Sequence, residues 1–177
     1  MIKAKSKILA LAVALTLAAT AAANSFSDQE TGLAKEIRKE LVTLPYYGVY
    51  DNLAFKIEGD IVTLFGQVTR PSTRKDAERR VAKIEGVERV INNIKVLPVS
   101  SFDDRIRVRT LRAIARTGSL YRYFQGANPS IHIIVDHGNV TLEGVVSSKG
   151  DSNLAFIAAN GVSGVFKVTN NLVVKRD

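Results

Sequence analysis

The sequence predicts an α+β fold: two tandem α-β-β-α-β modules, each a three-stranded sheet with two helices on one face. The main observation is an internal repeat, in which two separate stretches recur with the same offset of 78 residues. The matched stretches are 62–68 with 140–146 and 86–96 with 164–174. A unit of this length is a small domain, because single solenoid repeats are shorter. We therefore expect two domains, over 28–98 and 101–177, joined near Pro98.

Hydrophobic periodicity predicts the elements of the first module. Leu33, Ile37 and Leu41 share one helix face, and apolar residues alternate on both sides of the turn at Gly59-Asp60, which is typical of a hairpin. Pro71 suits the first turn of a second helix. The expected elements are a helix over 28–43, strands over 53–58 and 61–68, a helix from 71 that ends at Gly86, and a strand over 87–96.

The second module is expected to repeat this order. Its elements are a helix over 102–117, strands over 131–136 and 139–146, a helix over 149–160 and a strand over 165–175. Gly66 and Gly144 fall inside predicted strands, where glycine usually marks a bulge or a close backbone approach. The pairs Asn92-Asn93 and Asn170-Asn171 are expected to satisfy backbone groups at a bend. A role in holding a ligand is the alternative for both the glycines and the asparagines.

The N-terminal segment 1–23 has the features of a cleaved secretory signal peptide. Three lysines precede an apolar run over 8–19, and Ala21-Ala22-Ala23 fits the small-x-small cleavage pattern. A membrane anchor is the alternative, but the apolar run is short against the ~20 residues that a span requires. We expect cleavage after Ala23 and a periplasmic protein whose membrane association, if any, is peripheral rather than integral.

Positive charge is concentrated in the second half of the chain. The whole chain has a formal net charge of +8, of which the signal lysines supply +3. Residues 28–98 carry 12 basic and 11 acidic groups (+1), whereas residues 101–177 carry 10 basic and 6 acidic groups (+4). This asymmetry indicates an anionic partner. In an exported protein such a partner is a lipid headgroup, an anionic glycan or an acidic protein surface, and nucleic acid is not expected.

No catalytic, metal or cofactor site is expected from the sequence. The chain has no cysteine and only two histidines, His132 and His137. They are five residues apart across a predicted strand and therefore lie on opposite faces, which is poor geometry for a shared metal. Neither a nucleophile elbow nor a phosphate-binding loop is present in the sequence. We expect a non-enzymatic protein without a cofactor or a small-molecule substrate.

The repeated motifs resemble the BON domain family. The resemblance rests on the hairpin motifs, on Gly-Val after the second helix (Gly86-Val87 and Gly164-Val165) and on the Asn-Asn endings of the last strands. Two such domains behind a signal peptide are similar to the osmotically inducible, OsmY-like periplasmic proteins and their outer-membrane-associated relatives. The resemblance implies a non-enzymatic periplasmic protein. It also implies that some members bind anionic phospholipid and support envelope integrity, stress tolerance or the folding of outer-membrane proteins.

A row of arginines at helical spacing is the feature of the sequence that most clearly indicates a binding surface. Arg105, Arg109, Arg112 and Arg116 are spaced 4, 3 and 4 residues apart and fall within about a 60° arc of a helix. Arg107 breaks the pattern and is expected to reach around the helix edge. We call the four in-phase arginines the arginine ridge. The guanidinium group pairs with phosphate through its planar fork, which suits a lipid headgroup.

Aromatic residues follow the arginine ridge and complete the candidate site. Tyr and Phe side chains settle at the headgroup level of membranes. The predicted lipid-binding residues are Arg105, Arg109, Arg112, Arg116, Tyr121, Arg122, Tyr123 and Phe124. An ordinary solvated helix face, with the aromatics packed in the domain, remains the alternative. A second function also remains open, a protein-binding or chaperone-like factor that uses sheet edges or the tyrosine-rich loop 45–50. This loop is first expected to pack on its own hairpin, and contact with the other domain or with a partner protein is the alternative.

Overall fold

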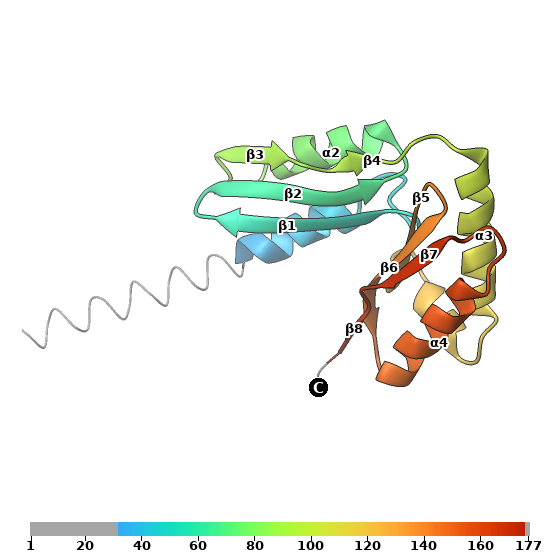
Figure 1. Cartoon of the computed structure of the whole chain (residues 1–177). Coiled ribbons are helices and arrows are strands. Elements are labelled where there is room, and N and C mark those ends of the chain that lie inside the picture. The colour runs from blue at the N-terminus through green and yellow to red at the C-terminus, as the bar shows by residue number, and fades with distance from the viewer. Residues whose placement is uncertain (1–31, 176–177) are drawn as a thin grey trace, which may run out of the picture.

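A computed structural model describes residues 32–175 of the chain (Figure 1). The first module comprises a helix over 32–42, β1 (Asn52–Glu58), β2 (Ile61–Val68), α2 (Pro71–Val81), β3 (Arg89–Asn92) and β4 (Lys95–Val96). The second comprises α3 (Ser101–Ala115), the short 3-10 helix η1 (Leu120–Phe124), β5 (Ile131–Asp136), β6 (Asn139–Val146), α4 (Lys149–Asn160), β7 (Lys167–Asn170) and β8 (Val173–Val174). The predicted α+β fold with two repeated modules is confirmed. The predicted signal peptide at 1–23 lies outside the described residues.

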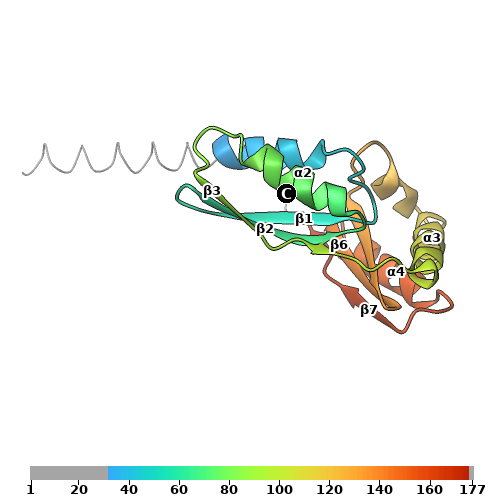
Figure 2. The same ribbon diagram turned by 90° about the horizontal axis from the view of Figure 1, so that it is seen from above.

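The two sheets have the same topology and the same register. β1 pairs antiparallel with β2, and β2 pairs parallel with β3 and β4. In the second module β5, β6, β7 and β8 repeat this arrangement, with β6 in the centre. The parallel pairing follows from the crossover helix between the second and third strands, since a parallel connection needs such a crossover. Figure 2 shows the two helices of the first module on one face of its sheet.

The third strand of each module is interrupted, where the sequence predicts a continuous strand. At the interruption one asparagine makes the same hydrogen bond in both copies: Asn92 Oδ1 accepts from Ile94 N, and Asn170 Oδ1 accepts from Leu172 N, each at 3.2 Å. Asn170 Nδ2 also donates to the carbonyl oxygen of Ser152 at 3.2 Å, so the bend is tied to the preceding helix. The structural role predicted for these asparagines is confirmed.

Gly66 and Gly144 are required by a close backbone approach within each hairpin. Their φ angles are 113° and 115°, in a region that L side chains rarely adopt. A Cβ atom would lie 2.0 Å from the carbonyl oxygen of Asn52 at the first glycine and 2.0 Å from that of Ser130 at the second. The predicted structural role of both glycines is therefore confirmed.

Each module has its own hydrophobic core between its sheet and its helices. Ile37, Leu64 and Val81 are among the buried residues of the first core. Ile114, Ile133 and Leu142 are among those of the second. Within residues 32–175 no helix is both long enough and apolar enough to span a bilayer.

The tyrosine-rich loop of the first module packs on the second module. Val49 O accepts a hydrogen bond from Ile133 N at 2.7 Å, and Val49 and Tyr50 pack against the second core. Tyr47 packs on its own core and also faces the His132 ring, with ring centroids 5.5 Å apart. Burial raises the pKa of Tyr47 to about 12, which keeps it neutral at the junction. The loop therefore makes both predicted contacts: Tyr47 packs within its own module, and Val49 and Tyr50 make the contact with the other domain that was the alternative.

Candidate functional site

Local sequence fixes both ends of α3, the helix that carries the arginine ridge. The Ser100 hydroxyl accepts from Asp103 N at 3.1 Å, so it caps the first turn. Acidic Asp103 and Asp104 lie in the first turn, and basic Arg112 and Arg116 lie at the C-terminal end. Both charge placements stabilise the helix through its dipole. The ridge therefore lies on a helix that has an N-terminal cap and favourable charges at both ends.

The four ridge arginines lie on the exposed side of α3. Ile106, Thr110 and Ile114 form the buried side against the second core. Arg105, Arg109, Arg112 and Arg116 are all exposed, as the 4-3-4 spacing predicts. The sequence pattern thus correctly predicts which side of the helix carries the charge.

The ridge charges are not neutralised by neighbouring carboxylates. Within residues 32–175, none of the four ridge guanidinium groups has a carboxylate oxygen within 4.0 Å. Arg109 makes one weak contact, from Nη1 to the carbonyl oxygen of Ser163 at 3.5 Å. The ridge therefore presents a positive field to its surroundings, and this field attracts anionic surfaces.

Arg107 has a structural role distinct from that of the ridge. Its side chain is only 4% exposed. It pairs with Asp104 at 2.5 Å and donates to the carbonyl oxygen of Val135 at 2.8 Å, which ties α3 to β5. The sequence prediction that it reaches around the helix edge is wrong, since the side chain turns inward.

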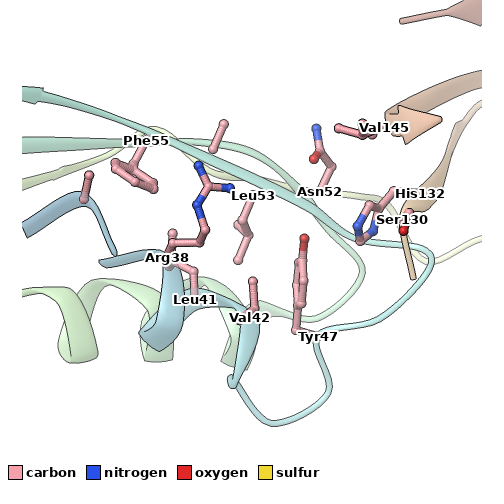
Figure 3. A pocket seen from close by; sticks show the side chains of 13 residues that line it. Arg38, Leu41, Val42, Tyr47, Asn52, Leu53, Phe55, Ser130, His132 and Val145 are labelled. Carbon is pink, nitrogen blue, oxygen red and sulfur yellow. The ribbon is translucent and has the colours of Figure 1, made fainter. Parts of the chain in front are cut away.

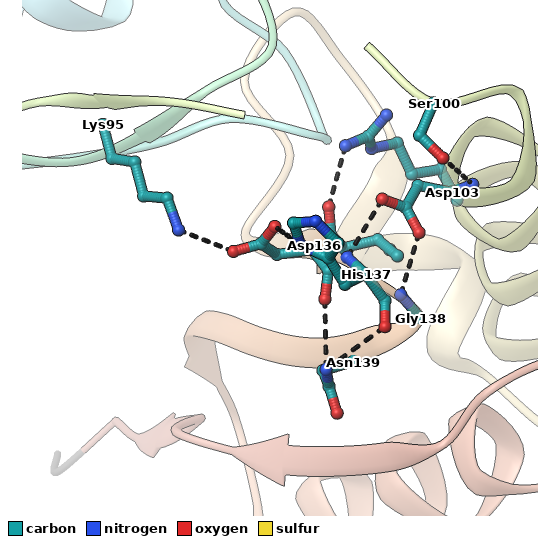
Figure 4. Close-up of polar contacts among 9 residues, drawn as sticks. Lys95, Ser100, Asp103, Asp136, His137, Gly138 and Asn139 are labelled. Carbon is teal, nitrogen blue, oxygen red and sulfur yellow. Dashed lines mark hydrogen bonds and ion pairs between the residues drawn. The ribbon is translucent and has the colours of Figure 1, made fainter. Parts of the chain in front are cut away.

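Asp103 makes a second tie between α3 and the β5–β6 turn. Its carboxylate oxygens accept from His137 N at 3.0 Å and from Gly138 N at 2.8 Å (Figure 4). The carboxylate is buried, and these two backbone donors compensate for its removal from water. Together with Arg107, Asp103 holds the ridge helix in a fixed position on the sheet.

The predicted aromatic segment is only partly available at the surface. Tyr123 is 6% exposed, so it cannot contact a lipid surface, and its place in the predicted site is corrected. Its hydroxyl donates to Asp151 Oδ2 at 2.9 Å and accepts from Ser147 N at 2.8 Å. Phe124 is half-buried against the core, whereas Tyr121 is 55% exposed. The sequence analysis did not predict the 3-10 helix η1, in which Leu120 and Tyr123 are the buried residues.

Arg122 is engaged within the module. Its Nη2 lies 2.9 Å from Asp151 Oδ2, and its guanidinium group stacks over the Tyr123 ring, 4.9 Å from the centroid. A hydrogen bond from Ser148 and the contacts with Tyr123 and Arg122 lower the pKa of the Asp151 carboxyl, so it stays ionised as the partner of Arg122. The charge of Arg122 is thus compensated, and the four ridge arginines with Tyr121 remain as the exposed part of the predicted site.

The outer face of α4 is apolar, a feature that the sequence analysis did not identify. Leu154, Phe156 and Ile157 are exposed, Ile157 to 65%. The packed side of the same helix uses the small residues Ala155 and Ala159. One signal could have revealed this apolar face. On a helical projection of α4 the large apolar residues lie on one side and the alanines lie on the other. We call these three residues the apolar face of α4.

Two aromatic residues, Phe102 near the start of α3 and Phe166 just before β7, form an exposed pair. Phe102 and Phe166 have ring centroids 6.1 Å apart, and Phe166 is 75% exposed. Phe102 lies one turn before Arg105 and two turns before Arg109, at the edge between these arginines and the buried side of the helix. Exposed aromatic and aliphatic groups therefore accompany the ridge at α3 and on the adjoining α4.

α2 of the first module, which corresponds to α4 in the repeat, has a different surface. α2 exposes a mixture of basic and acidic residues, and Arg79 pairs with Asp76 at 2.6 Å. Arg80 pairs with Glu40 of the first helix at 3.2 Å. A surface of paired, opposite charges has little net field. On α2 basic and acidic residues are thus interspersed, whereas the arginine ridge of α3 contains no acidic residue.

The family assignment follows from the repeat itself. The BON domain family matches the chain twice, over residues 29–98 and 102–176. The chain belongs to the BON domain family. BON membership supports an envelope-associated role, and BON domains are in general non-catalytic modules. In the described BON modules, no group of three or more His, Cys, Asp or Glu residues is arranged to hold a metal ion.

Other comparisons add little to the BON assignment. A search of curated proteins finds no match. The chain is similar to two solved structures of CdsD, a structural protein of the type III secretion system of Chlamydia trachomatis, at 10% and 12% identity. The alignments cover 80% and 81% of this chain and 96% and 92% of those chains, with TM-scores of 0.28 and 0.30. At such TM-scores the likeness carries no argument about this protein.

Proposed function

We propose that this BON protein is exported to the periplasm and associates peripherally with anionic phospholipid surfaces through its second module. The observation that carries the proposal is the arginine ridge: four exposed guanidinium groups on one side of α3, without a carboxylate within 4.0 Å among the described residues. In this role the protein supports envelope integrity and stress tolerance, and it acts without catalysis.

Electrostatic attraction accounts for the first part of the binding. Each basic residue near an anionic membrane surface contributes about 1 kcal/mol. The four ridge arginines would then contribute about 4 kcal/mol, which alone corresponds to a dissociation constant near the millimolar range. Binding by charge alone is therefore weak, reversible and sensitive to salt.

Exposed apolar side chains supply the second part. Burying a large aliphatic or aromatic side chain stabilises by about 1.5–3 kcal/mol relative to leaving it in water. Phe102 of α3, Tyr121 of η1 and the apolar face of α4 are all exposed in the second module. A few of these side chains at the headgroup level would raise the affinity well above that of the ridge alone.

Vesicle sedimentation tests the proposal directly. The mature protein is mixed with vesicles of phosphatidylcholine alone or of phosphatidylcholine with phosphatidylglycerol or cardiolipin. We expect the protein to pellet only with the anionic vesicles and to be released as the salt concentration rises, because exposed charges are screened over ~8 Å at physiological ionic strength. Equal recovery with neutral and anionic vesicles, or no recovery with either, contradicts the proposal.

A further inference from the structure

The edge strands of the two sheets, β1 and β5, occupy equivalent places but are covered differently. β5 is an edge strand of its sheet, and the tyrosine-rich loop of the first module lies along it, through the hydrogen bond from Ile133 N to Val49 O. β1 is the corresponding edge strand of the first sheet. The described residues contain no equivalent segment bonded along β1. β5 is therefore an example, within the same chain, of this edge strand with a further segment hydrogen-bonded to it.

The inward-facing side chains of β5 and β1 also differ in how deeply they are buried. Ile131, Ile133 and Val135 of β5 are all 0% exposed. The residues 78 positions earlier are Leu53, Phe55 and Ile57 of β1, and all three are only half-buried, although they pack on the first core. Each pair has the same place in its hairpin register, for example Phe55 opposite Leu64 and Ile133 opposite Leu142. The inner face of β1 is thus incompletely covered.

Backbone donors along β1 point toward the open edge. In an antiparallel pair, the N–H groups of alternate residues point toward and away from the partner strand. Ile133 N points away from β6, since it donates to Val49. Phe55 has the equivalent place, so its N–H, and that of Ile57 two residues on, point away from β2. An unpaired edge of this kind is a template for an added strand.

A groove runs beside this edge. It has a volume of about 570 Å³ and lies between the helix at 32–42, β1 and the β5–β6 hairpin of the second module (Figure 3). Leu41, Leu53 and Phe55 line its apolar wall, and Arg38 projects from the helix beside them (Figure 3). The groove lining contains no Asp or Glu. Its chemistry therefore fits an apolar segment with a negative charge near Arg38.

We propose that the β1 edge and this groove bind an extended apolar polypeptide segment carrying an acidic residue, supplied by another protein. The added segment would pair with Phe55 and Ile57 through its main chain, as Val49 pairs with Ile133, and place alternate side chains over the half-buried β1 residues. Main-chain pairing gives such binding its affinity, and the side-chain sites give it selectivity. The inference does not depend on lipid binding, because the groove lining contains none of the predicted lipid-binding residues.

Amide exchange measured by NMR tests the inference on the full mature protein. The probe is a short fluorescein-labelled peptide in which valine alternates with threonine and glutamate. We expect the amides of Phe55 and Ile57 to exchange rapidly in the free protein and to gain protection when the peptide is added. Slow exchange at both amides before peptide addition would show that this chain or a second copy already occupies the edge, and would overturn the proposal. Protection confined to other strands would also overturn it.

A charge-reversal variant distinguishes peptide binding in the groove from non-specific binding of the peptide elsewhere on the protein. Arg38→Glu should weaken binding of the acidic peptide about tenfold, because it replaces an attraction with a repulsion beside a partly desolvated chain. The matched control is Lys75→Glu on the exposed side of α2, outside the groove lining, which should change the affinity less than about twofold. Fluorescence anisotropy measures both. Equal weakening by the two variants, or peptide binding that neither affects, contradicts the proposed site.

Discussion

Ile133 of β5 donates its backbone N–H to the carbonyl oxygen of Val49 at 2.7 Å, so a main-chain hydrogen bond joins the two modules. Lys95 and Asp136 add an ion pair across the same junction, at 2.6 Å (Figure 4). Burial of Val49 and Tyr50 on the second core gives the junction an apolar component as well. The two BON modules therefore form one continuous body in which the first contributes to the packing of the second.

Val49→Asp tests the contribution of the junction to stability. A carboxylate against the second core should lower the free energy of unfolding by about 1–2 kcal/mol, since Val49 is half-buried and a charge loses part of its hydration there. Urea denaturation measures the change. Tyr46→Asp is the matched control in the same loop, because Tyr46 is 67% exposed and should change stability little. Equal destabilisation by the two variants contradicts this role of the junction.

His132 should make stability depend on pH. Burial lowers its pKa below the ordinary value of 6.5, and a hydrogen bond to the carbonyl oxygen of Gly48 opposes this only in part. Below about pH 6.5 the unfolded chain therefore takes up a proton that the folded chain resists. The free energy of unfolding should fall as the pH drops from about 7 toward 5.

Denaturation of His132→Gln across this pH range isolates the effect. The variant should show a shallower loss of stability with falling pH than the unaltered protein, whatever its absolute stability. His137→Gln replaces the other histidine of the chain, at an exposed turn, and should retain the steeper dependence. A slope that is unchanged in His132→Gln rules out this histidine as the titrating group.

Gly144→Ala should be strongly destabilising. The new Cβ would lie 2.0 Å from Ser130 O at a φ of 115°, and such backbone strain alone costs about 1–3 kcal/mol before the clash is counted. Thermal denaturation should show a Tm lowered by more than that of Gly118→Ala. Gly118 also has a positive φ, 54°, but has no atom within 4 Å of its Cβ position. Similar Tm values for both variants would mean that the hairpin accommodates the clash.

The fold was predictable because the repeat supplies two independent copies of each signal. Gly66 and Gly144, or Asn92 and Asn170, each recur with the same offset, and each pair has the same structural role in the two copies. The interruption of the last strands was not predicted, although the asparagines that cause it were singled out. Local side-chain bonding to the backbone competes with strand pairing, and periodicity alone does not show which prevails.

Of the candidate site, the sequence correctly predicted only the part that depends on helix periodicity, the arginine ridge. The 4-3-4 spacing correctly placed the arginine ridge on the exposed side of α3, because the geometry of a helix is regular. Tyr123 and Arg122 were misjudged, because their partner Asp151 lies 28 residues or more along the chain and no local pattern shows it. The apolar face of α4 was missed for a related reason: which side of an apolar helix is packed depends on tertiary contacts.

Processing of the N-terminus tests the proposed export. The exported protein should begin at Asn24 or within a few residues of it, because the small-residue motif ends at Ala23. Mass spectrometry of the periplasmic fraction measures the mature mass, and a cytoplasmic fraction from cells with blocked secretion serves as the unprocessed reference. A product that retains Met1 and stays embedded in the membrane would contradict the signal-peptide interpretation.

Charge reversal on the arginine ridge tests the central proposal most directly. Arg105→Glu with Arg109→Glu should weaken binding to phosphatidylglycerol vesicles at least about tenfold, since each basic residue contributes about 1 kcal/mol and both signs are reversed. The matched control is Lys35→Glu with Lys39→Glu, at the same i,i+4 spacing on the exposed side of the first helix. Both double variants should keep the circular dichroism spectrum and the Tm of the unaltered protein. Selective loss of vesicle binding in the ridge variant is the predicted result. Unchanged binding in that variant at equal stability, or equal loss in both variants, would contradict the proposal that the ridge binds the membrane.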